Sequence, residues 1–199
     1  GLLQTILYNQ NRQQTRVRLF EIGRTFLPRD HDIVQERMLG GAVYGAAVAE
    51  QWDTARREVD LYDAKADIEA LFVLAGMDGG VLFRPGMHPA LHPGQTAEIQ
   101  YHGQPIGLLG LLHPTIQAGM GLSQPVVLYE LRLSSLEGER VPIFKEFSRF
   151  PSIRRDIAIM VNETIPAQAV LDCVQKTAGR LLVNLELFDE YRGKGIDSG

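Results

Sequence analysis

Predicted strands dominate this sequence, and few helices separate them. Apolar runs rich in β-branched and aromatic residues predict strands over residues 17–27, 38–44, 81–84, 96–101, 105–112 and 126–132. Pro28 is expected to end the first strand, and His102-Gly103 is a plausible hairpin turn. Strands that follow one another in runs favour an antiparallel sheet over a parallel one. We therefore predict an α+β fold in which helices flank an antiparallel sheet and cover one of its faces.

The clearest helix is predicted over residues 61–75, where apolar side chains recur at three- and four-residue spacing. Asp60 stands at the N-cap position, and Gly76 follows the last turn. Shorter helices are predicted over 2–12 and 114–120. Because no capping residue precedes the helix at 2–12, we expect the chain to be a piece of a longer protein.

The sequence pattern changes around Arg140-Val141-Pro142, where mixed charges show no clear period. We place a linker over 137–148 and divide the chain into 1–140 and 141–199. The second part predicts a strand, a helix that starts at a proline, and another strand, over 154–161, 166–178 and 182–190. This order is a single βαβ unit.

Composition narrows the class of protein. With 45% hydrophobic and 22% charged residues, the chain can bury a core, and disorder is excluded as its main state. No run approaches the roughly 18 apolar residues of a membrane span, so no membrane association is expected. The single cysteine, Cys173, excludes an internal disulfide and a cysteine-built zinc site, and fits a cytoplasmic protein. The net charge of −4 argues against a protein that coats nucleic acid with its whole surface, but it does not exclude a local basic patch.

Two sets of residues have the spacing of functional motifs without the right context. His88 and His92 lie four positions apart, as zinc ligands do on a helix, but Pro89 and Pro93 disfavour a regular helix there. We predict a structural turn there, and the same for His113. Three glycines lie inside an apolar run that does not open a helix, which favours a bulge or close packing over a phosphate loop: Gly103, Gly107 and Gly110. Neither catalytic residues nor a metal site are predicted.

The basic residues of the second part indicate a function more clearly than the histidines and glycines do. Residues 145–155 contain four cations and one carboxylate, and two further cations lie near the end: Lys145, Arg149, Arg154, Arg155, Arg192 and Lys194, with Glu146 as the acid. Aromatic residues stand among them: Phe147, Phe150 and Tyr191. Cations beside aromatic rings can hold RNA, because charge meets phosphate and rings stack on bases. The alternative is a solvated surface with a hydrophobic anchor for the linker.

Several strings resemble the β-subunit family of bacterial phenylalanyl-tRNA synthetase. In the first part they are GLLQTILYNQNR at 1–12, VRLFEIG at 17–23, HPGQ at 92–95 and GLLGLLHP at 107–114. In the second they are FSRFPSIRRDIA at 147–158 and FDEYRGKG at 188–195. The resemblance runs through nearly the whole chain in order.

For residues 1–140 the resemblance implies a class II synthetase-like core that is catalytically silent. Where a catalytic relative carries a Gly-x-Gly-x-x-Arg stretch, residues 126–133 read VVLYELRL and contain no glycine. Arg18 and Glu21 match the motif 2 pattern only loosely. The resemblance therefore implies no cofactor in this chain, while the full enzyme would use ATP and magnesium.

For residues 141–199 the resemblance implies part of a ferredoxin-like anticodon-binding domain. Its first two strands are not neighbours in that fold, because the third lies between them. We therefore expect this region to be mobile, or to pair with another copy or with the main domain.

The resemblance also implies partners: the synthetase α subunit, in a heterotetramer, and tRNA(Phe). The expected tRNA contacts are Arg149, Arg154, Arg155, Arg192 and Lys194, and the N-terminal helix is the better candidate for a protein contact. Two other functions stay open. One is a free-standing enzyme that uses the histidines, and the other is a protein-interaction module without an RNA role.

Overall fold

A computed structural model describes residues 1–29, 32–77, 79–137 and 151–191. The chain divides into two compact units, Gly1–Ile143 and Phe144–Gly199. They are described separately below. The expected linker over 137–148 lies almost wholly outside the described residues.

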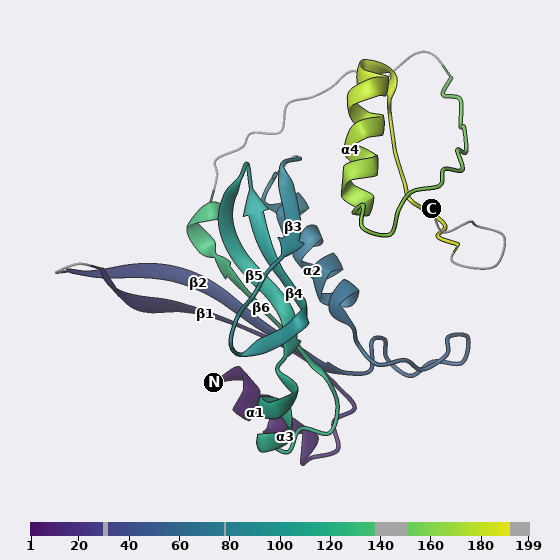
Figure 1. The fold of residues 1–199 in the computed structure, drawn as a ribbon. Helices are drawn as coiled ribbons and strands as arrows, with labels where there is room; N and C mark the ends of the chain where they lie inside the picture. The colour runs from purple at the N-terminus through teal and green to yellow at the C-terminus, as the bar shows by residue number, and fades with distance from the viewer. Residues whose placement is uncertain (30–31, 78, 138–150, 192–199) are drawn as a thin grey trace. The chain divides into compact units, whose positions relative to one another are not determined.

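The first unit is built on one six-stranded antiparallel sheet with the order β1-β2-β6-β5-β4-β3 (Figure 1). The strands are β1 (Arg16–Arg29), β2 (Asp32–Gly45), β3 (Val81–Pro85), β4 (Leu91–Tyr101), β5 (Gln104–Leu112) and β6 (Val126–Arg132). The helices are α1 (Leu2–Gln10), α2 (Leu61–Leu74) and α3 (Pro114–Gly119). This arrangement confirms the predicted α+β class and antiparallel sheet.

Helices cover both faces of the sheet, not one. On one face, Ile68 and Phe72 of α2 pack with Val127 and Leu131 of β6. On the other face, Ile6 of α1 packs in a second core cluster. This second cluster also contains Val17, Ala42, Tyr44, Leu112, Leu122 and Val126, with Ile116 of α3 beside it. β6 therefore has buried side chains on both faces, which is the environment of a central strand.

Three strands are clearly longer than the sequence predicts, and β2 begins at Asp32, well before the predicted start at Met38. β1 continues through Pro28, which is opposite Ile33 of β2, so the prediction that Pro28 ends this strand was wrong. Proline has no backbone N–H to donate, but β1 is the outer strand of the sheet, where one side of the backbone needs no partner. β4 starts at Leu91, and a register irregularity between Leu91 and Thr96 accommodates Pro93 and Gly94.

Local capping explains where α2 begins. The Asp60 carboxylate accepts hydrogen bonds from the backbone N–H groups of Tyr62 (2.8 Å) and Asp63 (3.1 Å), as predicted for an N-cap. Asp63 in turn accepts from the Asp60 N–H at 2.9 Å. The Arg57 guanidinium contacts both oxygens of Asp63, at 2.6 and 2.7 Å. This network fixes the first turn of the helix that covers one face of the sheet.

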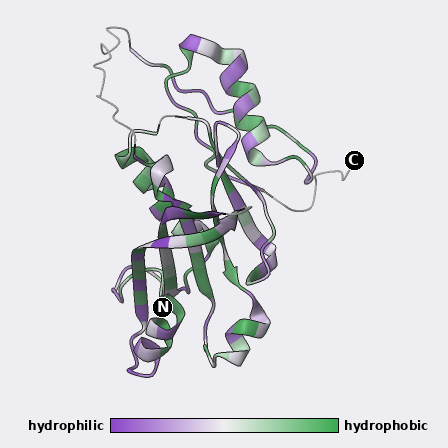
Figure 2. Ribbon diagram, turned by 90° about the vertical axis from the view of Figure 1, so that its left-hand side faces the viewer, coloured by the Kyte–Doolittle hydropathy of each residue, from purple (hydrophilic) through white to green (hydrophobic). Residues whose placement is uncertain are grey.

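The second unit contains a helix, α4 (Ala167–Ala178), followed by a 3₁₀ turn, η2 (Gly179–Leu181). The predicted helix is confirmed. The strands predicted over 154–161 and 182–190 are not present, because neither described segment pairs with a neighbouring strand. Figure 2 shows α4 striped purple and green, and its apolar residues Val170, Leu171 and Val174 are only half-buried. No residue described in this unit is fully buried.

Gly41 provides a test of packing across the sheet. A Cβ atom built on Gly41 would overlap the ring of Tyr129, which lies directly opposite on β6. Gly41→Ala should therefore lower the free energy of unfolding by about 1–3 kcal/mol in urea denaturation. Combining it with Tyr129→Ala should cost less than the sum of the two single changes, because the clash is removed. Strict additivity would contradict this account.

The Arg57–Asp63 contact generates a pH prediction. The hydrogen bond from Arg57 is the main cause that lowers the pKa of Asp63 from 3.8 to about 2. Because the folded-state pKa lies below the unfolded one, the stabilisation is complete above pH 4 and is lost as the pH falls from there toward 2. An NMR titration should find Asp63 near pKa 2, and Arg57→Gln should return it toward its ordinary value. A normal pKa in the unmodified chain would refute this.

Candidate functional site

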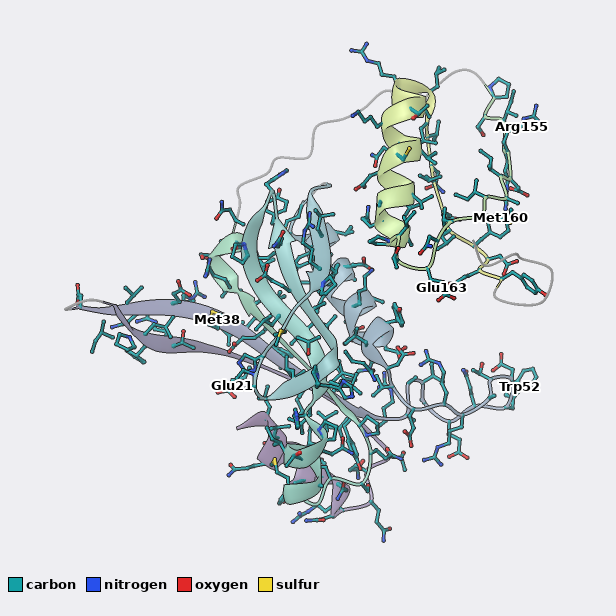
Figure 3. All side chains as sticks on the ribbon, viewed as in Figure 1. Glu21, Met38, Trp52, Arg155, Met160 and Glu163 are labelled. Atoms are coloured by element: carbon teal, nitrogen blue, oxygen red, sulfur yellow. The ribbon has the colours of Figure 1, made fainter. Side chains whose placement is uncertain are left out.

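The candidate RNA-contact residues that the structure describes are Arg154 and Arg155. Both are exposed on an extended segment that follows Pro151. Figure 3 labels Arg155 on this segment, apart from α4. The other three predicted contacts, Arg149, Arg192 and Lys194, lie outside the described residues. The structure therefore places two neighbouring cations of the predicted set on one exposed strip of chain.

Arg154 has two neighbours that define its chemistry. Its Nε donates to Oδ1 of Asp156 at 3.2 Å, and its guanidinium carbon lies 5.8 Å from the centre of the Phe188 ring. The ion pair is exposed on both sides, so solvent screens it strongly and a phosphate can compete with the carboxylate. Phe188 is itself exposed. The pair thus offers a cation and a ring face together, which suits a nucleotide.

Phe188 was missed as a neighbour of Arg154 by sequence reasoning. The aromatic residues singled out there were Phe147 and Phe150, which lie outside the described residues, and Tyr191, which is exposed. Phe188 is 34 positions from Arg154, and no local period connects them. Only the return of the chain after α4 brings the ring to the guanidinium.

The three singled-out histidines cap turns. Nδ1 of His88 accepts from the Ala90 N–H at 3.2 Å, Nδ1 of His92 accepts from Gly94 at 3.0 Å, and Nδ1 of His113 accepts from Thr115 at 3.2 Å. Each donating N–H group belongs to the residue two positions further on, directly after a proline. The predicted structural turns are confirmed. Within the described ranges, no group of three or more His, Cys, Asp or Glu side chains could hold a metal ion.

The three glycines also have packing roles. His102 and Gly103 both have positive φ, 47° and 78°, as a tight hairpin turn between β4 and β5 requires. A Cβ on Gly107 would overlap the backbone oxygen of Glu130, and one on Gly110 would lie 2.9 Å from Oγ1 of Thr96. These contacts confirm the turn and close packing.

The stretch 126–133 offers no room for a nucleotide. Val126 and Leu131 are fully buried in opposite core clusters, and the Tyr129 ring fills the space over Gly41. Burial raises the pKa of Tyr129 above its ordinary value. The residues of β6 therefore do not fit ATP: bulky side chains occupy the space that a phosphate cradle would need.

Arg18 and Glu21 point to opposite faces of β1. The Arg18 guanidinium forms an ion pair with Asp67 of α2 and donates to the Ala47 carbonyl oxygen at 3.2 Å. It thus ties the outer strand to the helix. Glu21 is exposed on the other face (Figure 3). The two side chains do not form one site.

The N-terminal helix packs its apolar face against the sheet. Ile6 is completely buried, and Leu2, Leu3 and Leu7 pack beside it. Gln10 anchors the end of the helix, because its Oε1 accepts from the Tyr44 hydroxyl at 2.8 Å and its Nε2 donates to the Gly121 oxygen at 2.9 Å. The apolar face of this helix is therefore part of the core, and a protein contact on α1 stays a prediction that would have to use its other face.

Two family descriptions match consecutive parts of the chain. Residues 1–133 match the phenylalanyl tRNA synthetase beta chain CLM domain, and residues 148–199 match the ferredoxin-fold anticodon binding domain. The chain belongs to the phenylalanyl-tRNA synthetase beta chain family. All five candidate basic residues fall within the second match.

Curated relatives agree with this family along the whole chain. The phenylalanine–tRNA ligase beta subunit of Hahella chejuensis is 50% identical over 196 residues, which is 98% of this chain and 25% of that protein. Those of Pseudomonas savastanoi pv. phaseolicola and Pseudomonas fluorescens (strain Pf0-1) are 47% and 45% identical over 99% and 100% of this chain, and again 25% of each protein is covered. The chain thus spans about a quarter of the length of these relatives.

A looser structural match is a pyrrolysyl tRNA synthetase from Desulfitobacterium hafniense. It has a TM-score of 0.46 at 15% identity and covers 67% of this chain and 44% of that one. Separately, none of the helices in the described residues is long and apolar enough to cross a membrane.

The capping role of His113 can be measured. His113→Ala removes the side-chain acceptor at the start of α3, so the free energy of unfolding should fall by about 1 kcal/mol in urea. His113→Asn, which restores a side-chain acceptor at the cap, should recover most of the loss. An equal loss in both variants would show that the imidazole acts by packing and not by capping.

Proposed function

We propose that this chain is part of the β subunit of a phenylalanine–tRNA ligase, in which it acts as a non-catalytic scaffold and contributes to binding of tRNA(Phe). The observation that carries the proposal is the succession of both family matches in one chain, over 1–133 and then 148–199. The complete enzyme would attach phenylalanine to tRNA in the cytoplasm, with ATP and magnesium as cofactors. The α subunit would be its partner.

In this proposal the two parts of the chain have different tasks. Residues 1–140 form the class II synthetase-like core without catalytic residues, and the filled faces of β6 support this role. Residues 141–199 form the linker and the first part of the anticodon-binding domain. Chemistry would then take place elsewhere in the assembly, and no step of it passes through the described side chains.

The tRNA contacts in this proposal are Arg149, Arg154, Arg155, Arg192 and Lys194. For Arg154, a phosphate would replace Asp156 as the partner of the guanidinium, while the Phe188 ring offers a stacking surface for a base. Among the residues that the structure describes, Arg155 is exposed and forms no ion pair. Such contacts contribute to tRNA affinity through charge, so the affinity falls as the salt concentration rises.

Charge reversal in the complete ligase tests this role. Arg154→Glu combined with Arg155→Glu should weaken tRNA binding. The slope of log affinity against log salt should fall by roughly 1 for each lost phosphate contact. In aminoacylation assays KM for tRNA should rise while kcat changes little, because no catalytic group is altered. Filter binding across a salt series measures the affinity, and Arg180→Glu on the 3₁₀ turn is the matched control.

The competing function is a protein-interaction module without an RNA role. Under that function, the double variant and Arg180→Glu would bind tRNA with the same affinity and the same salt slope. The proposed tRNA contacts would then be abandoned, while the scaffold role of the first unit would remain.

A further inference from the structure

The segments that build one end of the first unit, around α1 and α3, contain no acidic residue. Residues 1–20 include three arginines but no Asp or Glu, and residues 99–129 include neither acids nor Lys or Arg. Over the whole chain, by contrast, 24 acids outnumber 20 basic residues. The charge of this acidic chain is therefore distributed unevenly, and the segments around α1 carry a local excess of positive charge.

Hydrogen bonds join these segments into one surface. Oε1 of Gln10, at the end of α1, accepts from the backbone N–H of Ser123 at 2.9 Å, and its Nε2 donates to the Gly121 oxygen at 2.9 Å. Figure 1 shows α1 and α3 together at this end of the unit. The turn that leaves α1 is tied to the sheet, because the Thr15 carbonyl oxygen accepts from the Ala46 N–H at 2.8 Å. Six exposed residues of α1, this turn and the start of β1 are here called the polar end: Tyr8, Asn11, Arg12, Gln13, Gln14 and Arg16.

The two arginines of the polar end have no carboxylate partner among the described residues. The guanidinium carbon of Arg12 lies 3.4 Å from the centre of the Tyr8 ring, and both side chains are exposed. Arg16 is exposed at the start of β1. A small surface hollow beside it is lined by Glu50 but also by Arg56, so cations outnumber the acid there. Both arginines therefore keep their charge available for an anionic ligand.

Gln13 has a backbone conformation that glycine would adopt more easily. Its φ of 61° lies in the left-handed region, directly after the end of α1. Glycine is the usual residue at such a position, because a Cβ atom is disfavoured there. The turn is nevertheless closed, since the Gln14 N–H donates to the Asn9 oxygen at 3.1 Å. A glutamine where glycine would suit the fold better indicates that its exposed amide has a task outside the fold.

The composition of the polar end matches the sugar–phosphate backbone of RNA. Phosphate and sugar oxygens are bound by Arg, Asn, Gln and Tyr side chains, which are the types present here. A guanidinium stacked on a tyrosine ring also presents a flat cation to an unpaired base. A protein interface would need an apolar centre. The large aliphatic side chains of α1 cannot supply one, because they pack in or beside a core cluster: Leu2, Leu3, Ile6 and Leu7.

We propose that the polar end is a second tRNA contact of the ligase, in which Arg12 and Arg16 bind phosphates and the Gln13 amide donates to the sugar–phosphate backbone. This inference rests on the proposed function, because tRNA is the RNA that the ligase would bind. It gives the synthetase-like core a part in tRNA binding, in addition to the anticodon-binding match over 148–199. The outward face of α1 then contacts RNA and not another protein.

The test measures affinity of the complete ligase for tRNA(Phe) by filter binding across a salt series. Arg12→Glu combined with Arg16→Glu should weaken binding at least about tenfold, and the slope of log affinity against log salt should fall by roughly 1 for each lost phosphate contact. The matched control is Arg24→Glu combined with Arg84→Glu. It makes the same change in charge at exposed arginines of β1 and β3, and it should leave affinity and slope unchanged.

Gln13→Gly separates binding from stability. The unfolding temperature of the β subunit should rise, because glycine accepts the positive φ without strain. Affinity for tRNA(Phe) should nevertheless fall about threefold or more, because the amide is lost. A residue with a purely structural role would not lower the affinity while raising the unfolding temperature.

If the double arginine variant does not fold, Gln13→Gly decides the outcome. The inference is overturned if the variants of the polar end bind tRNA as tightly as the control does. It is also overturned if they weaken association with the α subunit and leave tRNA affinity unchanged, which would assign the surface to a protein contact. If Arg154→Glu with Arg155→Glu weakens tRNA binding and the polar-end variants do not, this inference fails alone. If the unmodified ligase does not bind tRNA(Phe), the proposed function fails first.

Discussion

Pairing of backbone groups between neighbouring strands is the constraint on which this structure depends. In the first unit every strand finds at least one antiparallel partner, and the inner strands find two. Side chains can then close two core clusters, one on each face of β6. In the second unit the segments on either side of α4 find no such partner in the described residues. There the apolar residues Ile157, Met160 and Phe188 stay exposed. Strand pairing therefore accompanies a buried core in the first unit, and where it is missing in the described residues of the second unit, the apolar side chains stay exposed.

The position of β6 at the centre of the sheet links packing to the absence of a nucleotide site. A phosphate cradle needs backbone N–H groups that a ligand can approach, and glycine permits that approach. On β6 the N–H groups are engaged in ladders with β2 and β5, and the side chains are bulky. The neighbouring strands carry glycines opposite β6, but beside one of them, Gly41, the Tyr129 ring occupies the space. Filling this space stabilises the fold and at the same time removes the room for chemistry.

Local signals in the sequence predicted local structure well. The Asp60 cap, the apolar period of α2 and the His102-Gly103 turn each depend on neighbouring residues, and each was confirmed. The full length of β1 was not predicted, because whether Pro28 is tolerated depends on its place at the outer edge of the sheet. Pairing of β2 with β6 joins residues more than 80 positions apart, and a local sequence period cannot predict a pairing over that separation. The contacts Arg18–Asp67 and Arg154–Phe188 were missed for the same reason.

Four apolar side chains on one face of the β1–β2 hairpin, here called the stripe, are exposed: Phe20, Ile22, Phe26 and Ile33. Their exposure and the burial of α1 illustrate why an apolar pattern alone does not identify an interface. Both segments contain several large apolar side chains, but α1 packs onto a face of the sheet and is held there by Gln10. The stripe lies on the outer strands, beyond the part of the face that α2 covers, so nothing in the first unit shields it. The distribution of charge adds information that hydrophobicity lacks, because surface charge selects partners more than it stabilises a fold.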